Sequence, residues 1–167
     1  MLYAQEILGL GGVGYGVLLT AFAAGGVAGG FLAERVSGLL GTGRTISVIF
    51  LLEGAAFATL ALTTDPFLAG PMIALDALAG TVWNVVTISL RQELIPERLL
   101  GRVFSAFRMV GFGGMALGAL TSGLLAREFG LTVPFWVAAA TMVVLSATCA
   151  IAVNNRAVKE AMEEAQS

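Results

Sequence analysis

The chain has 167 residues, of which 57% are apolar and 12% charged, and its formal net charge is −2. Soluble domains carry roughly 25% charged residues, so this composition excludes an ordinary soluble domain, and the small charge without a basic cluster argues against a nucleic-acid partner. Histidine is absent and Cys149 is the single cysteine, which excludes a disulfide framework and a Cys/His zinc site. We expect neither a metal site nor a cofactor.

Five apolar stretches of about twenty residues run through the chain. A helix of that length crosses roughly 30 Å of hydrocarbon. The sequence therefore predicts an all-α, polytopic membrane helical bundle with five transmembrane helices. The predicted spans are 13–33, 45–63, 67–90, 103–126 and 131–153. Residues 1–12 precede this transmembrane domain (13–153), and residues 154–167 follow it as a polar tail.

Basic residues outside the spans fall on alternate connections, which predicts an orientation. Short cytoplasmic loops retain Lys and Arg during insertion into a membrane. One side of the predicted bundle carries Arg35, Arg44, Arg91, Arg98, Arg102, Arg156 and Lys159, and the other side carries Arg127. The richer side should be the cytoplasm. We therefore expect a multi-pass protein of the cell membrane with its N-terminus outside and its C-terminal tail in the cytoplasm.

The connections contain residues that begin or end helices. Pro66 and Pro96 suit the first turn of a helix because proline has no N–H to donate, and Gly130 suits a C-terminal cap. Residues 96–101 are amphipathic. We expect them to form a short separate segment along the cytoplasmic surface.

Glycines recur at four-residue spacing in the first and fourth spans. Helices in a bilayer are held together mainly by close packing and hydrogen bonds, which small residues permit. The predicted helix-packing residues are Gly25, Gly26, Gly29, Gly30, Gly114 and Gly118. They form either static contacts or surfaces that slide in a protein with two states, and the sequence leaves both interpretations open.

Three ionisable residues, Glu53, Asp76 and Arg108, lie inside the predicted spans. A central charge costs about 2.5 to 3.5 kcal/mol on insertion-based scales, so such groups face protein or a water-filled path. Glu53 could accept a proton that drives transport, or stay protonated and donate a hydrogen bond. Arg108 could reach the cytoplasmic headgroups or pair with Asp76 or Glu53.

Asp76 also begins a polar stripe on the third predicted span. Gly80, Trp83 and Thr87 follow it at offsets of four, seven and eleven, on one helix face, with Asn84 beside them. A helix that lines a substrate path would show such a stripe with an aromatic residue. Interhelical hydrogen bonding would explain the same pattern.

The loop after the third span, residues 91–103, reads RQELIPERLLGRV. With its flanks, this string resembles the connection between transmembrane helices 10 and 11 of the major facilitator superfamily (MFS), particularly its bacterial drug and siderophore exporter branch. The resemblance rests on Asn84, Arg91, Gln92, Pro96, Glu97, Gly101, Arg102 and Arg108. Residues 30–35, with Glu34 and Arg35, are similar to the helix 8 to 9 signature of the superfamily, although Glu34 replaces an aspartate.

The resemblance covers helices 8 to 12 of a twelve-helix fold, and residues 1–12 look like the end of helix 7 with its outer loop. It implies part of the C-terminal half of a secondary transporter in which the two loop motifs take part in gating. It also implies proton-coupled export of small amphipathic molecules. Because helices 1 to 6 have no counterpart, we expect a truncated product, a fragment inactive alone, or one subunit of a split carrier, with the missing half or another integral protein as partner.

Other classes of function compete with transport. A non-transporting assembly or regulatory partner of another membrane protein would fit the same five helices. Catalysis without histidine would need an aspartyl pair of Asp76 with Glu53, and neither lies in a known catalytic string, so we expect no enzyme. The G-x-G-x-x-G match at residues 9–14 lacks a surrounding βαβ unit and is interpreted as accidental.

Overall fold

The computed structural model describes residues 2–152. In this range the chain forms six helices and no strand: α1 (Leu2–Glu6), α2 (Gly12–Leu40), α3 (Thr42–Leu62), α4 (Pro66–Leu94), α5 (Glu97–Phe129) and α6 (Val133–Ala152). The last five are long and apolar enough to cross a membrane. The predicted all-α, five-span bundle is thus confirmed. The end of the fifth predicted span and the tail 154–167 lie outside the described residues.

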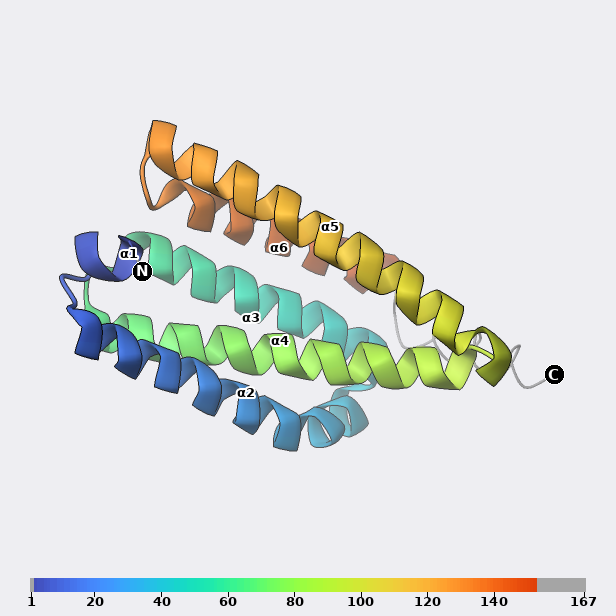
Figure 1. Cartoon of the computed structure of the whole chain (residues 1–167). Coiled ribbons are helices and arrows are strands. Elements are labelled where there is room, and N and C mark those ends of the chain that lie inside the picture. Colours follow the sequence, from blue (N-terminus) through green and yellow to red (C-terminus); the bar gives the residue numbers. More distant parts are fainter. Residues whose placement is uncertain (1, 153–167) are drawn as a thin grey trace.

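The helices alternate in direction and pack unevenly (Figure 1). Helix α2 lies along α4, and α3 lies against both α4 and α6. Helix α5 meets α4 near the connection between them and then diverges from it towards the opposite end of the bundle. None of the residues of α5 is buried. The chain therefore consists of a packed group, α2, α3, α4 and α6, with α5 along one side.

The predicted helix ends are partly correct. The Asp65 side chain accepts a hydrogen bond from the Phe67 N–H at 2.9 Å, and Pro66 opens α4. Gly130, with φ +104°, is the predicted C-cap of α5, and its N–H donates to the Ala126 carbonyl. Gly41, with φ +78°, lets α3 begin directly after α2.

The prediction that residues 96–101 form a separate surface segment is wrong. Pro96 is the N-cap of α5, and residues 97–101 are its first turns. No proline interrupts the chain between Glu97 and Val103, so the helix that enters the membrane continues outwards without a break. Similarly, α2 continues from the predicted boundary at Ala33 to Leu40.

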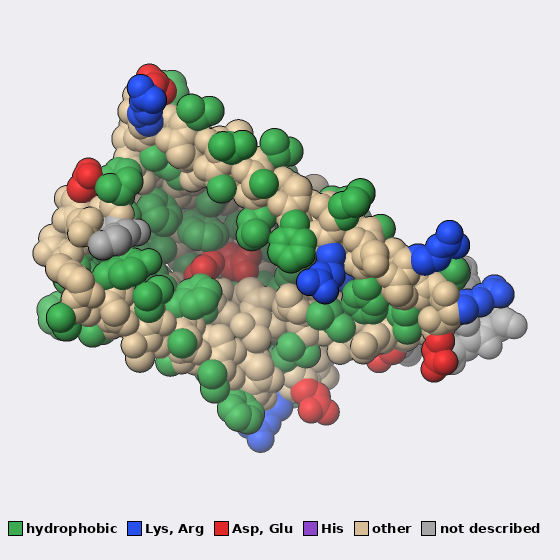
Figure 2. Space-filling model, in the orientation of Figure 1, with side chains coloured by type: hydrophobic (Ala, Val, Ile, Leu, Met, Phe, Trp, Pro, Cys, Tyr) green, Lys and Arg blue, Asp and Glu red, His purple; other side chains and the backbone are tan. Residues whose placement is uncertain are grey.

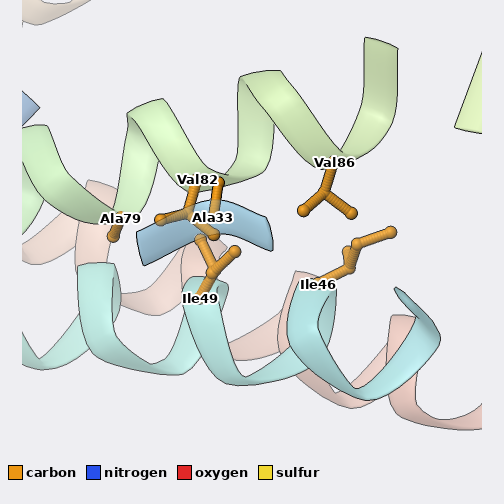
Figure 3. Packing of buried hydrophobic residues seen from close by; sticks show 6 residues of the cluster. All are labelled: Ala33, Ile46, Ile49, Ala79, Val82 and Val86. Carbon is orange, nitrogen blue, oxygen red and sulfur yellow. The ribbon is translucent and has the colours of Figure 1, made fainter. Parts of the chain in front are cut away.

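The core on the α4 side of the bundle is built from small and β-branched side chains. Ala33 of α2, two isoleucines of α3 and three residues of α4 form one buried cluster. Figure 3 shows how they interlock: Ala33, Ile46, Ile49, Ala79, Val82 and Val86. Alanines at these positions let the helix axes approach closely. Close packing of this kind holds membrane helices together, because the surrounding lipid is as apolar as the side chains and burial alone provides little driving force.

Two of the four predicted packing glycines of α2 lie directly against the backbone of α4. A β-carbon on Gly25 would overlap the backbone carbonyl of Ala74, and one on Gly29 would lie 2.5 Å from the Leu78 carbonyl oxygen. The same atom on Gly26 would lie 3.5 Å from the Thr81 hydroxyl, and on Gly30 it would meet nothing within 4 Å. The α2 and α4 backbones therefore touch along Gly25 and Gly29.

The predicted packing glycines of α5 have no partner within the described residues. A β-carbon on Gly114 or Gly118 would meet no atom within 4 Å. The physical reason is that α5 diverges from α4 and leaves its glycine face open. Any close packing on this face involves atoms outside the described residues.

Helix α1 closes one end of the bundle. The Tyr3 hydroxyl donates to the Leu60 carbonyl at 2.6 Å and lies 3.3 Å from the Thr63 carbonyl oxygen. Its ring packs on Phe135 of α6 with 4.7 Å between the ring centroids. Because Ala4 and Leu8 are also buried, the segment before α2 is attached to α3 and α6.

Candidate functional site

Two acidic side chains share a cavity between α2, α3 and α4. The cavity has a volume of about 320 Å³ and is called the acidic cavity below. Its lining residues are Phe22, Glu53, Asp76, Ala77, Gly80, Thr81, Asn84 and Val85. Figure 2 shows a hollow between α5 and the rest of the molecule with acidic side-chain atoms at its floor. Glu53 is 8% exposed and Asp76 is partly buried.

Glu53 lies beside Gly80 in this cavity. The Glu53 Oε1 atom lies 3.6 Å from the position that a β-carbon on Gly80 would occupy. Gly80 lies one turn after Asp76 on α4, so the two residues face the same side of the helix. A β-carbon at position 80 would thus make an ordinary van der Waals contact with the Glu53 carboxyl group, which places this group beside the turn of α4 that follows Asp76.

Neither carboxyl group has a hydrogen bond or ion pair with another described residue. The described residues that line the acidic cavity include no Lys or Arg. Two carboxylates in one desolvated cavity repel each other, and a proton on one of them relieves that repulsion. The cavity is thus chemically suited to hold a proton or a cationic group.

A second cavity lies between α4 and α5 and contains two arginines. It has a volume of about 650 Å³ and is called the arginine cavity below. Its lining residues are Trp83, Asn84, Thr87, Ile88 and Arg91 of α4 and Phe104, Phe107, Arg108, Val110 and Gly111 of α5. Asn84 lines both cavities, so the acidic and arginine cavities adjoin at this residue.

The two arginines lie over aromatic rings. The Arg91 guanidinium carbon is 4.3 Å from the centroid of the Phe107 ring and 5.9 Å from that of Phe104. The corresponding distance from Arg108 to Phe112 is 5.6 Å. Such cation–π contacts contribute about 0.5 to 2 kcal/mol, more where water is excluded. The Arg91 contacts connect α4 to α5 near the point where the two helices diverge.

The polar stripe predicted from Asp76 is divided between the two cavities. Asp76 and Gly80 line the acidic cavity, whereas Trp83 and Thr87 line the arginine cavity. The Thr87 hydroxyl donates to the Trp83 carbonyl of its own helix at 2.7 Å, and within residues 2–152 it makes no interhelical hydrogen bond. Among the described residues Arg108 forms no ion pair with Asp76 or Glu53.

The residues expected in the two gating loops gather at one end of the bundle. Glu34 and Arg35 lie near the end of α2, Arg91 and Gln92 lie in the last turn of α4, and α5 begins beside them. Most of these residues are exposed: Glu34, Arg35, Gln92, Pro96, Glu97, Gly101 and Arg102. Arg91 differs because it packs on two aromatic rings.

Comparison with known proteins decides the family. The sequence model of the transmembrane secretion effector family, which belongs to the MFS, matches residues 1–167 of this chain. The chain belongs to this family. The MFS resemblance inferred from the loop motifs is thereby confirmed, and the chain is a multi-pass membrane protein.

Individual relatives of this MFS chain are named multidrug resistance protein MdtH. The protein from Enterobacter sp. (strain 638) is 36% identical over 107 residues, which cover 64% of this chain and 26% of the relative. That from Edwardsiella ictaluri (strain 93-146) is 33% identical over 123 residues, 73% of this chain and 29% of the relative. The protein from Escherichia coli O1:K1 / APEC is 32% identical over 126 residues, which cover 75% of this chain and 29% of the relative. The chain spans less than a third of these relatives, and no solved structure matches it.

The sequence did not point to several residues that line the cavities of this MFS chain. Phe22 and Thr81 contribute to the acidic cavity, and Phe104 and Phe107 to the arginine cavity. A signal for the last two was present, because Phe104 and Phe107 are three residues apart at the start of a span and follow Arg91 across a short loop. Phe22 gave no such signal, since one phenylalanine in an apolar helix is indistinguishable from a lipid-facing one.

Proposed function

We propose that this chain supplies part of the C-terminal half of an MFS exporter that moves small amphipathic molecules out of the cell in exchange for protons. The family supports transport, and the relatives' name associates them with multidrug resistance. The observation that carries the coupling is the acidic cavity, which Glu53 of α3 and Asp76 of α4 line together without a basic partner among the described residues.

In this proposal the proton binds the Glu53 and Asp76 pair. Two unprotonated carboxylates repel across the cavity and favour an arrangement of α3 and α4 that separates them or admits water or a cation. Protonation removes the repulsion and lets the helices close. If a cationic substrate leaves this pair when a proton binds it, export of the substrate is coupled to entry of the proton, and no other ion is needed.

An MFS carrier binds its substrate between two six-helix halves and exposes it alternately to each side. The helices α2 to α6 provide a surface for one half, so we propose that a second set of membrane helices completes the carrier. We place residues 1–12 outside and the gating-loop residues in the cytoplasm, as the basic residues indicate. The chain then needs the bilayer, the complementary half and the substrate, and it catalyses no covalent reaction.

A non-transporting assembly role is less well supported. An assembly helix needs a complementary surface, but it does not need ionisable side chains inside the membrane. Glu53, Asp76 and Arg108 lie in the spans and line the acidic and arginine cavities, and each is costly there. Transport explains why these groups are present. The names of the matched relatives, which refer to multidrug resistance, also favour transport over an assembly role.

The test is export by a chimera in which this chain replaces the matched region of the MdtH relative from Enterobacter sp. (strain 638). Cells lacking their own exporter would be loaded with fluorescent amphipathic dyes of different charge, and retention would be compared with and without a protonophore. We expect at least one dye to be expelled by a process that the protonophore stops. Glu53→Gln and Asp76→Asn should each reduce this export at least about tenfold, whereas Glu128→Gln, at an exposed position, should not.

Assembly must be measured separately from export. The amount of each chimera in the membrane fraction and its size distribution in detergent would show whether it folds. A folded chimera that expels no dye, or whose export is unchanged by both Glu53→Gln and Asp76→Asn, would refute the proposal.

A further inference from the structure

A groove lies between α3 and α6, and it shares none of its described lining residues with the acidic or arginine cavity. It has a volume of about 590 Å³ and is called the α3/α6 groove below. Its described lining residues are all apolar, and more than half of them are glycine or alanine: Gly54, Ala55, Ala58, Ala139 and Ala140. Since a polar group would lose its hydrogen bonds there, the α3/α6 groove suits an apolar occupant.

Contacts along the groove and beyond both of its ends fix α3 and α6 to each other. A β-carbon on Gly54 would lie 3.4 Å from a backbone carbonyl oxygen of α6. Beyond one end of the groove, the Ser146 hydroxyl donates to the Ser47 carbonyl at 2.8 Å. Beyond the other end, the Phe135 ring lies 6.4 Å from that of Phe57, centroid to centroid. The α3/α6 groove is therefore a preformed feature of a packed helix pair.

The α3/α6 groove runs lengthwise through one half of the membrane. At one end, Trp136 lies three residues after the start of α6 at Val133, which is about 4.5 Å along the helix. At the other end, Val144 lies about 16 Å from that start. Tryptophan is enriched at the level of the lipid headgroups, and half of the hydrocarbon core is about 15 Å thick. The groove thus extends from near the headgroups to about the middle of the bilayer, which is the depth of one acyl chain.

The α3/α6 groove is continuous with the surface that meets lipid. Leu51, Trp136 and Val144 are exposed at its rim, and the exposed side chains of Leu52 and Val137 continue the apolar surface on both helices. A helix is about 10 to 12 Å wide with its side chains and would rest on this rim. An acyl chain is a single file of methylene groups that reaches the small residues below the rim, where it gains dispersion contacts on both sides.

We infer that the α3/α6 groove binds one acyl chain of a phospholipid, with Trp136 at the level of the headgroup. The orientation proposed above makes this a lipid of the outer leaflet. The site is independent of the proposed export, because it lies outside both cavities. A chain in this groove contacts α3 and α6 at once and stabilises their packing, in contrast to a lipid that only touches the outside of one helix.

Quenching of tryptophan fluorescence can test this site directly. Trp83→Phe leaves Trp136 as the only tryptophan of the chain. The purified full chain in detergent micelles would be titrated with a phosphatidylcholine that carries bromine near the middle of one acyl chain, since bromine quenches a tryptophan that it approaches. We expect quenching that saturates at a small mole fraction of lipid. Quenching that rises only in proportion to the mole fraction would show that lipid meets Trp136 by chance encounter, and it would overturn the inference.

Substitutions that fill the groove provide the second measurement. Ala140→Leu and Ala55→Leu place a larger side chain in it from opposite helices, and each should raise the lipid fraction for half-maximal quenching at least about threefold. Ala55→Leu is needed because residue 140 lies one turn after Trp136 and a leucine there also covers the indole ring. Ala147→Leu is the matched control, because Ala147 is exposed two turns further along α6 and outside the groove. It should leave the titration unchanged.

Native mass spectrometry gives a measurement that does not depend on tryptophan. The full chain, purified from its membrane in mild detergent, should retain one phospholipid more than Ala140→Leu and Ala55→Leu, and the same number as Ala147→Leu. Equal retention by all four proteins would contradict the inference. A dimer that both groove-filling variants abolish would assign the groove to a second copy of the chain, and a bound detergent in place of phospholipid would equally overturn the assignment.

Discussion

Gly29 of α2 and Leu78 of α4 bring two helix backbones into contact. A β-carbon on Gly29 would lie 2.5 Å from the Leu78 carbonyl oxygen and 3.0 Å from both the Leu78 α-carbon and the Thr81 β-carbon. Its chain neighbour Gly30 faces open space on the same helix. The two adjacent glycines therefore have different roles, and this difference can be measured.

We predict that Gly29→Ala destabilises the bundle by about 1 to 3 kcal/mol, because the methyl group displaces a backbone that cannot yield as a flexible side chain would. Gly30→Ala is the matched control and should be neutral or slightly stabilising, since alanine is favoured over glycine in a helix by up to about 1 kcal/mol. Equilibrium unfolding in mixed detergent micelles, followed by circular dichroism, compares the two. Equal effects would mean that the α2 and α4 backbones do not touch.

A second prediction concerns the attachment of α1. Tyr3→Phe removes the hydroxyl that donates to the Leu60 carbonyl at 2.6 Å but keeps the ring on Phe135. We expect a loss of about 1 kcal/mol in the free energy of unfolding. Tyr15→Phe serves as the control, because the Tyr15 hydroxyl has no hydrogen bond with a described residue. Identical unfolding curves for the wild type and Tyr3→Phe would contradict the prediction.

A third prediction concerns the contact that joins α4 to α5. Phe107→Leu removes the ring 4.3 Å from the Arg91 guanidinium carbon, so the angle between α4 and α5 should become more variable. Spin labels at Phe67→Cys and Leu124→Cys, in a Cys149→Ala background, would report this as a broader distance distribution by electron double resonance. Met109→Leu, at an exposed position, should leave the distribution unchanged. An unaltered distribution in Phe107→Leu would show that this contact does not set the angle.

A fourth prediction concerns orientation. The basic residues place the connection before α4 outside the cell and the end of α4 in the cytoplasm. Thr64→Cys and Glu93→Cys are exposed positions at these two ends, and each would be introduced singly in the Cys149→Ala background. A membrane-impermeant maleimide added to intact cells should label Thr64→Cys and spare Glu93→Cys until the cells are opened. Labelling of both before opening, or the reverse order, would refute this orientation.

Hydropathy was sufficient to predict the helical class and the five spans. Each helix that crosses a bilayer must itself be apolar and satisfy its own backbone hydrogen bonds, so the signal lies within each segment of the sequence. It was insufficient for the helix ends. Residues 34–40 and 97–102 extend α2 and α5 beyond the predicted spans, because a helix does not stop where its side chains become polar. Pro66, Pro96 and Gly130 marked helix ends, whereas Pro71 lies inside α4, so proline alone did not mark an end.

The candidate site was predicted in part for a similar reason. Glu53 and Asp76 were identifiable because an ionisable residue in a span is costly, and the structure places both in one cavity. Which residues face them depends on how α2 and α4 rotate against each other, and the sequence offered two glycine pairs without indicating which one would make the contact. The division of the polar stripe at Asn84 and the packing of Arg91 on Phe107 are consequences of tertiary packing.

The divergence of α5 from α4 has a mechanical consequence. Helix α5 has 33 residues, which makes it about 50 Å long, and it is joined to α4 at one end only, by the turn at Pro96 and the stacked Arg91. A rotation of about 5° around that hinge would carry its far end through about 4 Å. The far end of α5 is joined to α6 through Gly130, and α5 also contacts α6. Such a rotation would therefore carry the start of α6 with it at the opposite membrane face.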